Sequence, residues 1–335
     1  MPELPEVETV VGDLNKKIVG YKIVDFWSEW TKAIKSLTFK KFKQGIVGKK
    51  IIGVRRIGKN IFIDLSGGKT LYIHLKMTGH LLLKFQKNFQ FPISNFQTNS
   101  SDKIGVKEGN PSQLVLTDGL KIKSLKSKKE KDYFEDRVNQ YIRHRWILEK
   151  GKDSMAMEFS DMRKFAKIVL VDTDKVGDLP EIKKLGIDAM DKNFNLRKFK
   201  EILVKKQKSV IGIVLMDQYL IAGIGNIYRS EILFASGVDP RRKVAELKSV
   251  EIERIFEQIK KILKKAIKMR GTSDSDYRDT TGKPGNFQKV LKVYNREGKK
   301  CFSSETLPKN KKCDNIVERI QMGQRSVFIC KKCQK

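Results

Sequence analysis

No cysteine precedes residue 301 in this 335-residue chain, and the four that follow are Cys301, Cys313, Cys330 and Cys333. Cysteines gathered at one end suit a metal clip better than a disulfide framework in a reducing compartment. Elsewhere the chain has no glycine-rich fingerprint typical of nucleotide cofactors. These absences argue against a disulfide-stapled scaffold and favour a metal-bound module in residues 291–335.

Long hydrophobic runs are also missing. The longest apolar stretch, 211–225, is interrupted by Asp217 and Gln218 and is too short to cross a bilayer. The acidic N-terminus lacks the basic and apolar regions of a signal peptide. We therefore expect a cytoplasmic protein without a membrane partner.

Acidic residues are few relative to basic ones. Lys and Arg number 70 against 39 Asp and Glu, which gives a formal net charge of +31. Such an excess points to a polyanionic partner, and nucleic acid is the first candidate. The length allows two or more domains, and 39% hydrophobic residues with 18 Phe indicate a folded protein.

Hydrophobic periodicity predicts an α+β, multidomain protein. Residues 1–177 form a β-rich domain after an N-terminal helix, 178–290 a helical domain, and 291–335 the metal module. The segment from about 86 to 140, rich in Asn, Gln, Ser and Lys, is interpreted as a partly disordered insertion in which 114–122 could add a hairpin. Strand patterns cover 51–54, 61–65, 70–75 and 146–171, and helical patterns cover 199–204, 211–220, 227–234 and 250–269.

The first residues allow an unusual nucleophile. If Met1 is removed, Pro2 becomes a terminal secondary amine, and such a group has an ordinary pKa of roughly 8. Glu3, Glu6 and Glu8 follow within six positions. The alternative is structural: proline fixes the entry into a helix whose N-terminus favours negative charge.

Five separated motifs make the sequence more specific. They are the opening 2–9 (PELPEVET), 73–79 (IHLKMTG), 215–218 with 221–228 (LMDQ and IAGIGNIY), 282–285 (GKPG) and 330–334 (CKKCQ). In this order they resemble the motifs of the formamidopyrimidine-DNA glycosylase family. The resemblance covers nearly the whole chain outside the insertion.

The resemblance implies a fold and an activity. The fold is an N-terminal helix with a two-sheet β-sandwich, a helix-two-turns-helix domain and a C-terminal zinc-finger β-hairpin. The activity is removal of oxidised purines, such as 8-oxoguanine and formamidopyrimidines, from double-stranded DNA, followed by strand cleavage through β,δ-elimination at the abasic site. The family also implies a monomeric, bacterial, nucleoid-associated enzyme with one structural zinc ion.

The resemblance further implies catalytic roles for five residues. Pro2 would attack the sugar and form a Schiff base, Glu3 would handle protons, and Glu6 would lie near the flipped nucleotide. Lys59, on a hairpin turn, and Arg325, in the finger, would contact phosphates around the lesion. The alternatives are helix-dipole partners for the two carboxylates and a solvated surface charge for Lys59.

DNA-binding residues follow from the same comparison. Met77, Arg163 and Phe165 match residues that fill the gap left by a flipped nucleotide, with Arg163 and Phe165 on one side of an extended segment. Taken alone, Met77 and Phe165 would more often be core residues. His74 and His144 match positions expected to contact the DNA backbone, with a structural histidine as the alternative.

Asn226 ends a glycine-rich turn that would place amide groups against a phosphate, although such a turn can also merely join two helices. Gly212 departs from the family, which usually has a lysine there, so we expect that one phosphate or base contact is either missing or supplied by Lys206 or Lys208. The loop 271–285 matches the segment that closes over the flipped base.

The cysteine segment also departs from the family. The family has two residues within each cysteine pair, whereas eleven separate Cys301 from Cys313 here, and Ser304 stands where a second cysteine is usual. We expect an insertion in the first knuckle with four thiolates still closing a tetrahedral zinc site. The alternative is a zinc-free hairpin or unpaired thiols.

Two other functions remain open at this stage. A sister type, endonuclease VIII, uses the same proline chemistry on oxidised pyrimidines, and Leu4 with the Met77, Arg163 and Phe165 set favours the purine enzyme. A noncatalytic damaged-DNA-binding zinc protein would keep the basic charge and lose the chemistry. Pro2, Glu3 and Lys59 argue against it.

Overall fold

The computed structural model describes residues 1–86, 132–274, 276–302 and 313–335. Contacts group Met1–Gln86 with Tyr133–Lys335 as the first of two units. The fold below is that of the first unit. Most of the expected insertion, including the expected hairpin at 114–122, lies outside the described residues. Among the helices in the described ranges, none combines the length and the apolar character that a membrane span requires.

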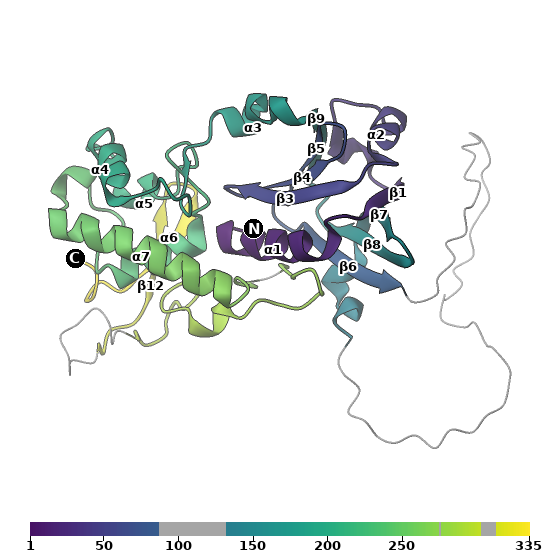
Figure 1. Cartoon of the computed structure of the whole chain (residues 1–335). Coiled ribbons are helices and arrows are strands. Elements are labelled where there is room, and N and C mark those ends of the chain that lie inside the picture. Colours follow the sequence, from purple (N-terminus) through teal and green to yellow (C-terminus); the bar gives the residue numbers. More distant parts are fainter. Residues whose placement is uncertain (87–131, 275, 303–312) are drawn as a thin grey trace, which may run out of the picture. The chain divides into compact units, whose positions relative to one another are not determined.

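The N-terminal helix α1 (Leu4–Ile18) links two hydrophobic cores. Pro5 lies in its first turn and Glu6 adds negative charge there, as helix N-termini favour. Its apolar residues from Val7 to Ile18 face the core of the β-rich part, whereas Leu4 belongs to the core of the helical part. α1 contacts both β3 (Ile51–Ile57) and α7 (Ser249–Lys268) (Figure 1).

Two sheets enclose the first core, which confirms the expected sandwich. The four-stranded sheet is antiparallel and has the order β1-β7-β8-β6, and the five-stranded sheet has the order β2-β9-β5-β4-β3, with only the β2–β9 pair parallel. Phe26, Trp146 and Phe159 of the first sheet and Ile63 and Leu71 of the second are buried in one cluster. The strands are β1 (Lys22–Ser28), β2 (Ile34–Lys35), β3 (Ile51–Ile57), β4 (Asn60–Leu65), β5 (Lys69–His74), β6 (His80–Gln86), β7 (Ile142–Lys150), β8 (Asp153–Ser160) and β9 (Lys167–Asp172).

The helical part has its own core, formed by α4, α6 and α7 around buried residues such as Phe199, Ile232 and Ile259. The predicted helix over 211–220 is wrong beyond residue 214, because Asp217 Oδ1 accepts a hydrogen bond from the Tyr219 backbone and closes a turn. The helices are α2 (Phe39–Ile46), α3 (Pro180–Lys183), α4 (Leu196–Val204), α5 (Ile211–Val214), α6 (Asn226–Ala235) and α7 (Ser249–Lys268).

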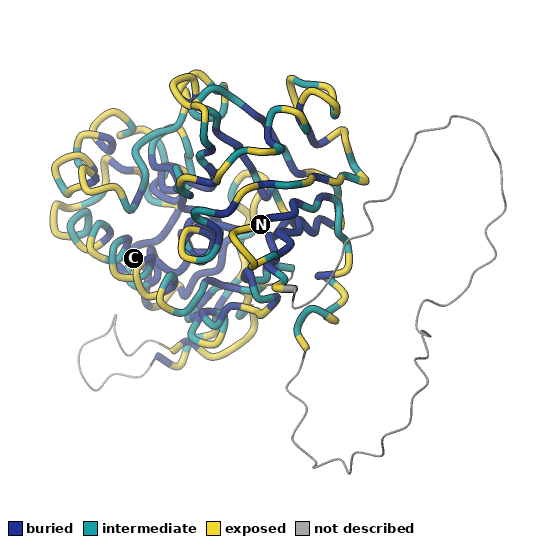
Figure 2. The backbone as a smooth tube through the Cα atoms, turned by 45° about the vertical axis from the view of Figure 1, so that its right-hand side comes forward, coloured by how far each residue is buried: buried dark blue, intermediate teal, exposed yellow. Residues whose placement is uncertain are grey.

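Short elements complete the described chain. A parallel pair, β10 (Ile187–Asp188) with β11 (Ile221–Ala222), went unpredicted because each strand has only two residues. The C-terminal hairpin consists of β12 (Glu318–Met322) and β13 (Arg325–Ile329). The 3-10 segments are Thr31–Ala33, Tyr133–Glu135, Arg137–Gln140, Thr173–Asp178, Val244–Glu246 and Phe287–Val290. Buried stretches surround the N-terminal end of the chain in Figure 2, where the candidate site lies.

Candidate active site and nucleic-acid interface

The Glu3 carboxylate caps a helix 222 residues away in the sequence. Its oxygens accept hydrogen bonds from Gly225 N at 2.8 Å and Ile227 N at 2.9 Å, at the start of α6. The unpaired N–H groups and the dipole of a helix N-terminus favour such a negative charge. A Cβ atom on Gly225 would lie 2.4 Å from the Glu3 carboxyl carbon, so this approach requires glycine.

Lys59 lies in the turn between β3 and β4, and its side chain points into the protein. It is only 6% exposed, and its Nζ donates to Ile224 O at 3.1 Å. Burial lowers the pKa of Lys59, while the charges of Glu3 and Glu6 raise it. The alternative of a solvated surface charge is therefore wrong. Gly58 allows the tight turn, since its φ is +59°.

The turn that carries Lys59 is tied to the helical part. The Asp188 carboxylate accepts a hydrogen bond from Gly58 N at 2.7 Å and also pairs with the mostly buried Arg56 guanidinium. Arg56 also pairs with Glu8 of α1 at 2.6 Å. These bonds hold the β3–β4 turn against both α1 and β10.

Glu6 is fully enclosed. Its carboxylate accepts hydrogen bonds from Glu3 N at 2.7 Å, the Tyr228 hydroxyl at 2.5 Å and Thr272 N at 2.7 Å. Burial, helped by the neighbouring Glu3 charge, raises the pKa of Glu6 to about 7. Glu6 therefore joins α1, α6 and the loop 271–285, and near neutral pH it holds a proton in part of the molecules.

Pro2 precedes this cluster of charges. Pro2 is buried while Met1 is exposed, so removal of Met1 would leave a terminal amine next to the Glu3 backbone. Glu3 just before α1, Glu6 in α1 and Lys59 in the β3–β4 turn are all buried near this chain end. Two carboxylates, a lysine and a terminal amine can together form a covalent adduct with a carbonyl carbon and move its protons.

Met77, Arg163 and Phe165 lie together on the surface. Arg163 Nη1 lies 3.2 Å from Met77 Sδ, and its guanidinium carbon lies 4.7 Å from the Phe165 ring centroid. Met77 is 39% and Phe165 50% exposed, so the alternative that they are core residues is wrong. Large apolar side chains held in the open favour contact with another molecule.

The segment that carries Arg163 and Phe165 is a loop, and the expectation of an extended segment is wrong. Lys164 between them has φ +56°, which is left-handed. The buried Asp161 carboxylate holds the loop by accepting hydrogen bonds from the Thr78 hydroxyl at 2.5 Å and Ala166 N at 2.9 Å. The two side chains meet because the loop turns.

The two candidate histidines make contacts within the protein. His144 is fully buried, its Nδ1 lies 2.9 Å from the Ser28 hydroxyl, and its ring stacks on Phe26, which favours the structural alternative. A contact of His144 with DNA stays a prediction. His74 accepts a hydrogen bond from Lys76 N at 2.9 Å, and burial lowers its pKa to about 3, which keeps the ring neutral. Its role toward DNA stays a prediction.

Asn226 lies at the start of a helix and Arg325 at the tip of a hairpin, and their phosphate-binding roles stay predictions. Asn226 is the first residue of α6, where backbone N–H groups are free of helical partners, and it is half-buried. Arg325 begins β13 and is exposed at the tip of the finger hairpin, next to Gly323 with φ +59°. Arg325 is close enough to Lys59 to lower its pKa.

The four cysteines form a single buried cluster. All four Sγ atoms lie within 4.8 Å of one another, with 3.7 Å for both Cys301–Cys333 and Cys313–Cys330. Tetrahedral bonds of about 2.3 Å place sulfur ligands of zinc roughly 3.8 Å apart, so the donor set fits a structural Zn²⁺. Ser304 lies outside the described residues.

Sequence reasoning missed the anchors of the loop 271–285. Asn139, at the end of the expected insertion, donates from Nδ2 to Gly282 O at 3.2 Å, and its Oδ1 accepts a hydrogen bond from His80 Nε2 at 2.8 Å. Leu83 N of β6 donates to Thr280 O at 2.8 Å. The low-complexity sequence before residue 140 gave no signal for the contacts of Asn139, because these contacts depend on groups far away in the sequence.

Comparisons with known protein families cover most of the chain. Residues 1–168 match the formamidopyrimidine-DNA glycosylase N-terminal domain, 185–278 match the formamidopyrimidine-DNA glycosylase H2TH domain, and 311–335 match the zinc finger found in FPG and IleRS. The third range includes three of the cysteines, and Cys301 precedes it. With the cysteine cluster, this match identifies the C-terminal hairpin as a zinc finger.

Whole-chain relatives agree. The formamidopyrimidine-DNA glycosylases of Pelotomaculum thermopropionicum and Carboxydothermus hydrogenoformans are each 33% identical to this chain over 335 residues, covering 100% of it and 99% and 100% of the relatives. Lactococcus lactis Fpg, solved in complex with abasic-site DNA, superposes with a TM-score of 0.73 at 27% identity, covering 99% of both chains. The complex of the same protein with DNA containing N7-benzyl-Fapy-dG superposes with a TM-score of 0.72 at 28% identity, and 100% of both chains is covered. The chain therefore belongs to the formamidopyrimidine-DNA glycosylase family of DNA repair enzymes.

Proposed function

We propose that this chain is a bifunctional DNA glycosylase and abasic-site lyase that removes oxidised purines through the amine of Pro2. The observation that carries the proposal is the convergence of buried Glu3, Glu6 and Lys59 around the chain end. Burying three charged side chains costs free energy unless they are paired or used. The family relationship supplies the substrate class, since the related Lactococcus lactis Fpg was solved with abasic-site and modified-purine DNA.

The reaction begins with attack of the neutral Pro2 nitrogen on C1′ of the damaged nucleotide. The N–C1′ bond forms, the bond from C1′ to the base breaks, and the base leaves with a proton. The sugar ring then opens: the bond between C1′ and the ring oxygen breaks, the ring oxygen takes up a proton, and an iminium remains between Pro2 and C1′. A proline iminium has no N–H to lose, so it stays cationic and acidifies the neighbouring C2′–H.

Strand cleavage follows from that cation. Loss of the C2′ proton expels the 3′ phosphate, a second elimination expels the 5′ phosphate, and water then releases the amine. Glu3 is suited to carry these protons because it adjoins Pro2 in the chain and is held by the start of α6. Lys59 lies near Glu3 and Glu6, whose charges raise the pKa of Lys59 against the effect of burial.

The lesion reaches Pro2 only if its nucleotide leaves the duplex, which costs stacking energy. We propose that Met77 and Phe165 wedge into the duplex and that Arg163, held between them, faces the unpaired base. Their exposure supports this use, because a wedge must be free to enter the DNA.

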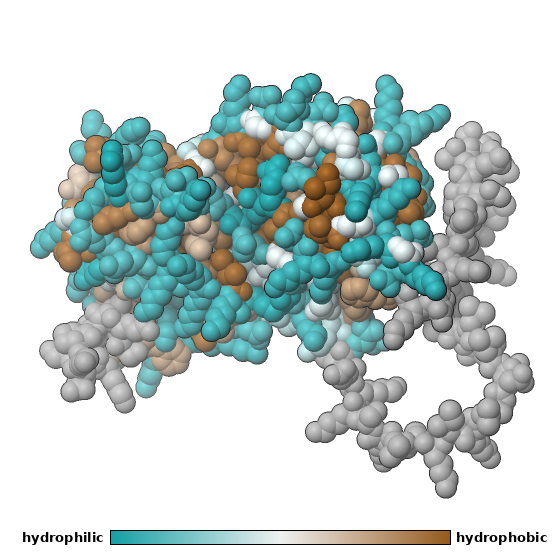
Figure 3. All heavy atoms as spheres, viewed as in Figure 1, coloured by the Kyte–Doolittle hydropathy of each residue, from teal (hydrophilic) through white to brown (hydrophobic). Residues whose placement is uncertain are grey.

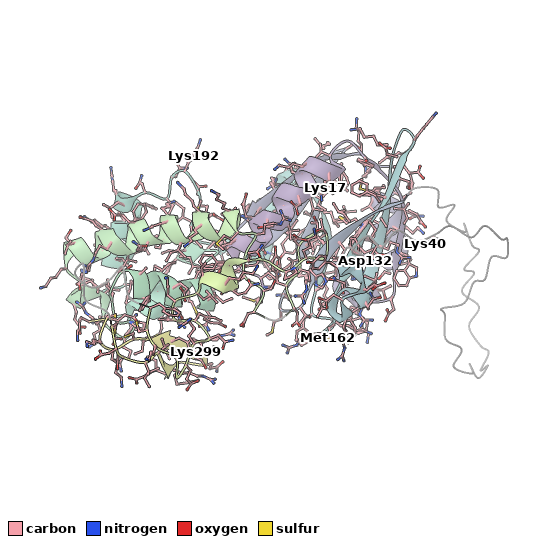
Figure 4. The ribbon with its side chains drawn as sticks, turned by 90° about the horizontal axis from the view of Figure 1, so that it is seen from below. Lys17, Lys40, Asp132, Met162, Lys192 and Lys299 are labelled. Carbon is pink, nitrogen blue, oxygen red and sulfur yellow. The ribbon has the colours of Figure 1, made fainter. Side chains whose placement is uncertain are left out.

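Positive charge over the surface supports DNA as the partner. Lys40, Lys192 and Lys299 come from distant parts of the described chain and all are exposed (Figure 4). Hydrophilic side chains cover most of the face in Figure 3, with apolar patches between them. Asn226 and Arg325 would bind phosphates, and binding would weaken steeply with salt. We further propose a monomer acting in the bacterial cytoplasm, at the nucleoid.

Borohydride trapping on abasic-site duplex DNA tests the nucleophile. The chain lacking Met1 is expected to give a stable covalent adduct, and peptide mapping is expected to place the sugar on Pro2. The same protein carrying Met1, or acetylated at Pro2, is the matched control and is expected to give none. An adduct on a lysine, or undiminished trapping by the blocked forms, would overturn the mechanism.

Excision assays test the substrate. Removal of 8-oxoguanine opposite cytosine is expected to be faster than removal of thymine glycol, and the reverse order would favour the endonuclease VIII type. Glu3→Gln is expected to lose the excision activity. Its free energy of unfolding is expected to fall by no more than about 1 to 3 kcal/mol, the usual range for a lost buried hydrogen-bonding group. DNA binding without any adduct in the unblocked chain would indicate a noncatalytic binder.

A further inference from the structure

Arg229 is a fully buried arginine in α6, one turn after Asn226. Its Nη2 donates to Asn226 Oδ1, its Nη1 donates to Gly212 O at 3.3 Å, and its Nε has no hydrogen-bond partner. Among the described residues it forms no ion pair with a carboxylate. Burial lowers the pKa of Arg229 to about 10, so the group still carries its charge at neutral pH. A buried, incompletely satisfied cation is costly, which points to a use.

The contact with Asn226 determines which way that side chain faces. A guanidinium carries donors and no acceptor, so the amide must turn its oxygen toward Arg229. The amide NH2 group then faces away from Arg229, where one of its two donors has the Tyr294 hydroxyl as a partner and the second remains for another acceptor. Without such a neighbour, the asparagine amide could adopt either of two orientations, and one of the two would present its acceptor oxygen to an anion.

Gly212 makes room for this arrangement. A Cβ atom on Gly212 would lie 2.8 Å from Pro240 O and 2.9 Å from Met322 Sδ, and neither neighbour leaves space for a side chain. Met322 ends β12, the strand that leads to Arg325, and its sulfur lies 4.0 Å from Arg229 Nη1. Arg229 therefore touches α5, the start of α6 and the finger hairpin.

A cation from α6 reaches the backbone of the glycine at 212. Arg229 bonds directly to the Gly212 carbonyl, and its charge lies near Glu3 and Arg325. Lys206 and Lys208, the expected substitutes, lie in the turn after α4, where Lys208 is exposed. No hydrogen bond joins either side chain to Asn226 or Gly212 among the described residues.

We propose that Arg229 is a positioning residue for DNA binding: it holds the Asn226 amide with its NH2 group toward a backbone phosphate. The inference rests on the proposed function. It concerns how tightly and in which orientation the phosphate is held, and it leaves the chemistry at Pro2 unchanged.

Equilibrium binding to a duplex containing a stable abasic-site analogue tests the inference. R229M and N226A are each expected to weaken binding roughly tenfold or more, as loss of a charge-assisted hydrogen bond does. The double variant is expected to bind no more weakly than N226A, because Arg229 acts through Asn226. R229K, which keeps a cationic donor, is expected to recover part of the affinity.

The control is R197M, which removes the same charge from an arginine side chain that is 89% exposed on α4. It is expected to change the affinity less than R229M at the same salt concentration. Equal affinities of R229M and the parent chain, or additive losses in the double variant, would overturn the inference. Failure of the parent chain itself to bind would instead overturn the proposed function.

A stability measurement keeps the test decisive if R229M folds poorly. N226D places a carboxylate against the Arg229 guanidinium, so N226D is expected to unfold at a higher temperature than the parent chain. The double variant R229K/N226D is expected to unfold at a lower temperature than N226D. The same N226D protein is expected to bind the duplex at least roughly tenfold more weakly, since the donor is gone. A lower unfolding temperature for N226D in the parent chain would show that residue 226 does not face Arg229.

Discussion

Replacing Glu6 by glutamine should change how the stability of the protein depends on pH. Glu6 is 1% exposed and accepts hydrogen bonds from Glu3 N, Tyr228 and Thr272. Its pKa rises from an ordinary value of 4.5 to about 7, mainly because of burial and then because of the Glu3 charge. The folded protein therefore holds this proton up to a higher pH than the unfolded chain does.

The sign and size of the effect follow from that difference. Below pH 4.5 the Glu6 carboxyl is protonated in both the folded and the unfolded state, so its ionisation does not affect the free energy of folding. Between pH 4.5 and about 7 only the unfolded chain releases the proton, and folding becomes less favourable as the pH rises. At about 1.4 kcal/mol per pH unit, the full cost above pH 7 is about 3 kcal/mol.

Glutamine at position 6 removes this pH dependence and lowers the free energy of unfolding by the same amount at every pH. Its oxygen can still accept from Tyr228 and Thr272, but its NH2 group then meets the Glu3 N–H, and one hydrogen bond of roughly 1 kcal/mol is lost at every pH. The parent chain should therefore lose about 3 kcal/mol of stability relative to Glu6→Gln between pH 4 and pH 8.

Urea denaturation of both proteins at several pH values measures this difference. The comparison with the variant is needed because burial lowers the pKa of His74 to about 3 and that of His144 to about 4, and these rings make the parent chain more stable as the pH rises. A stability difference that stays constant from pH 4 to pH 8 would refute the reasoning, because Glu6 would then titrate as in the unfolded chain.

Other substitutions test the site directly. Gly225→Ala should displace the Glu3 carboxylate, whose carbon would lie 2.4 Å from the new Cβ, and should reduce excision by roughly a hundredfold in single-turnover assays. Gly12→Ala in α1, where no atom lies within 4 Å of the new Cβ, should instead raise stability by about 0.5 to 1 kcal/mol with normal excision. Removal of zinc by a chelator should weaken DNA binding while borohydride trapping at high DNA concentration persists, and loss of trapping at every concentration would contradict a purely structural metal. Phe165→Ala should slow excision in duplex DNA more than trapping at a preformed single-stranded abasic site, and equal effects on both substrates would argue against a wedge.

Particular elements show how far the sequence could lead. Pro5, Glu6 and the apolar spacing after them predict α1 because these signals lie within one helix. The helical pattern at 211–220 misled, since a side chain of Asp217 competes with the helix for backbone N–H groups. The buried Arg229 was invisible, because a charged residue in a helix pattern looks like a solvated one until the neighbouring elements are placed.

The sequence by itself determined which chemical groups are present: a proline directly after Met1, adjacent carboxylates, four thiols and an excess of positive charge. It determined them because each is a property of residue type or of neighbours in the chain. Only the tertiary structure decided that Glu3 lies on the first turn of α6, that Lys59 points inward, and that His144 is enclosed. Those contacts join residues far apart in the sequence, and packing of the two cores around α1 is what brings them together.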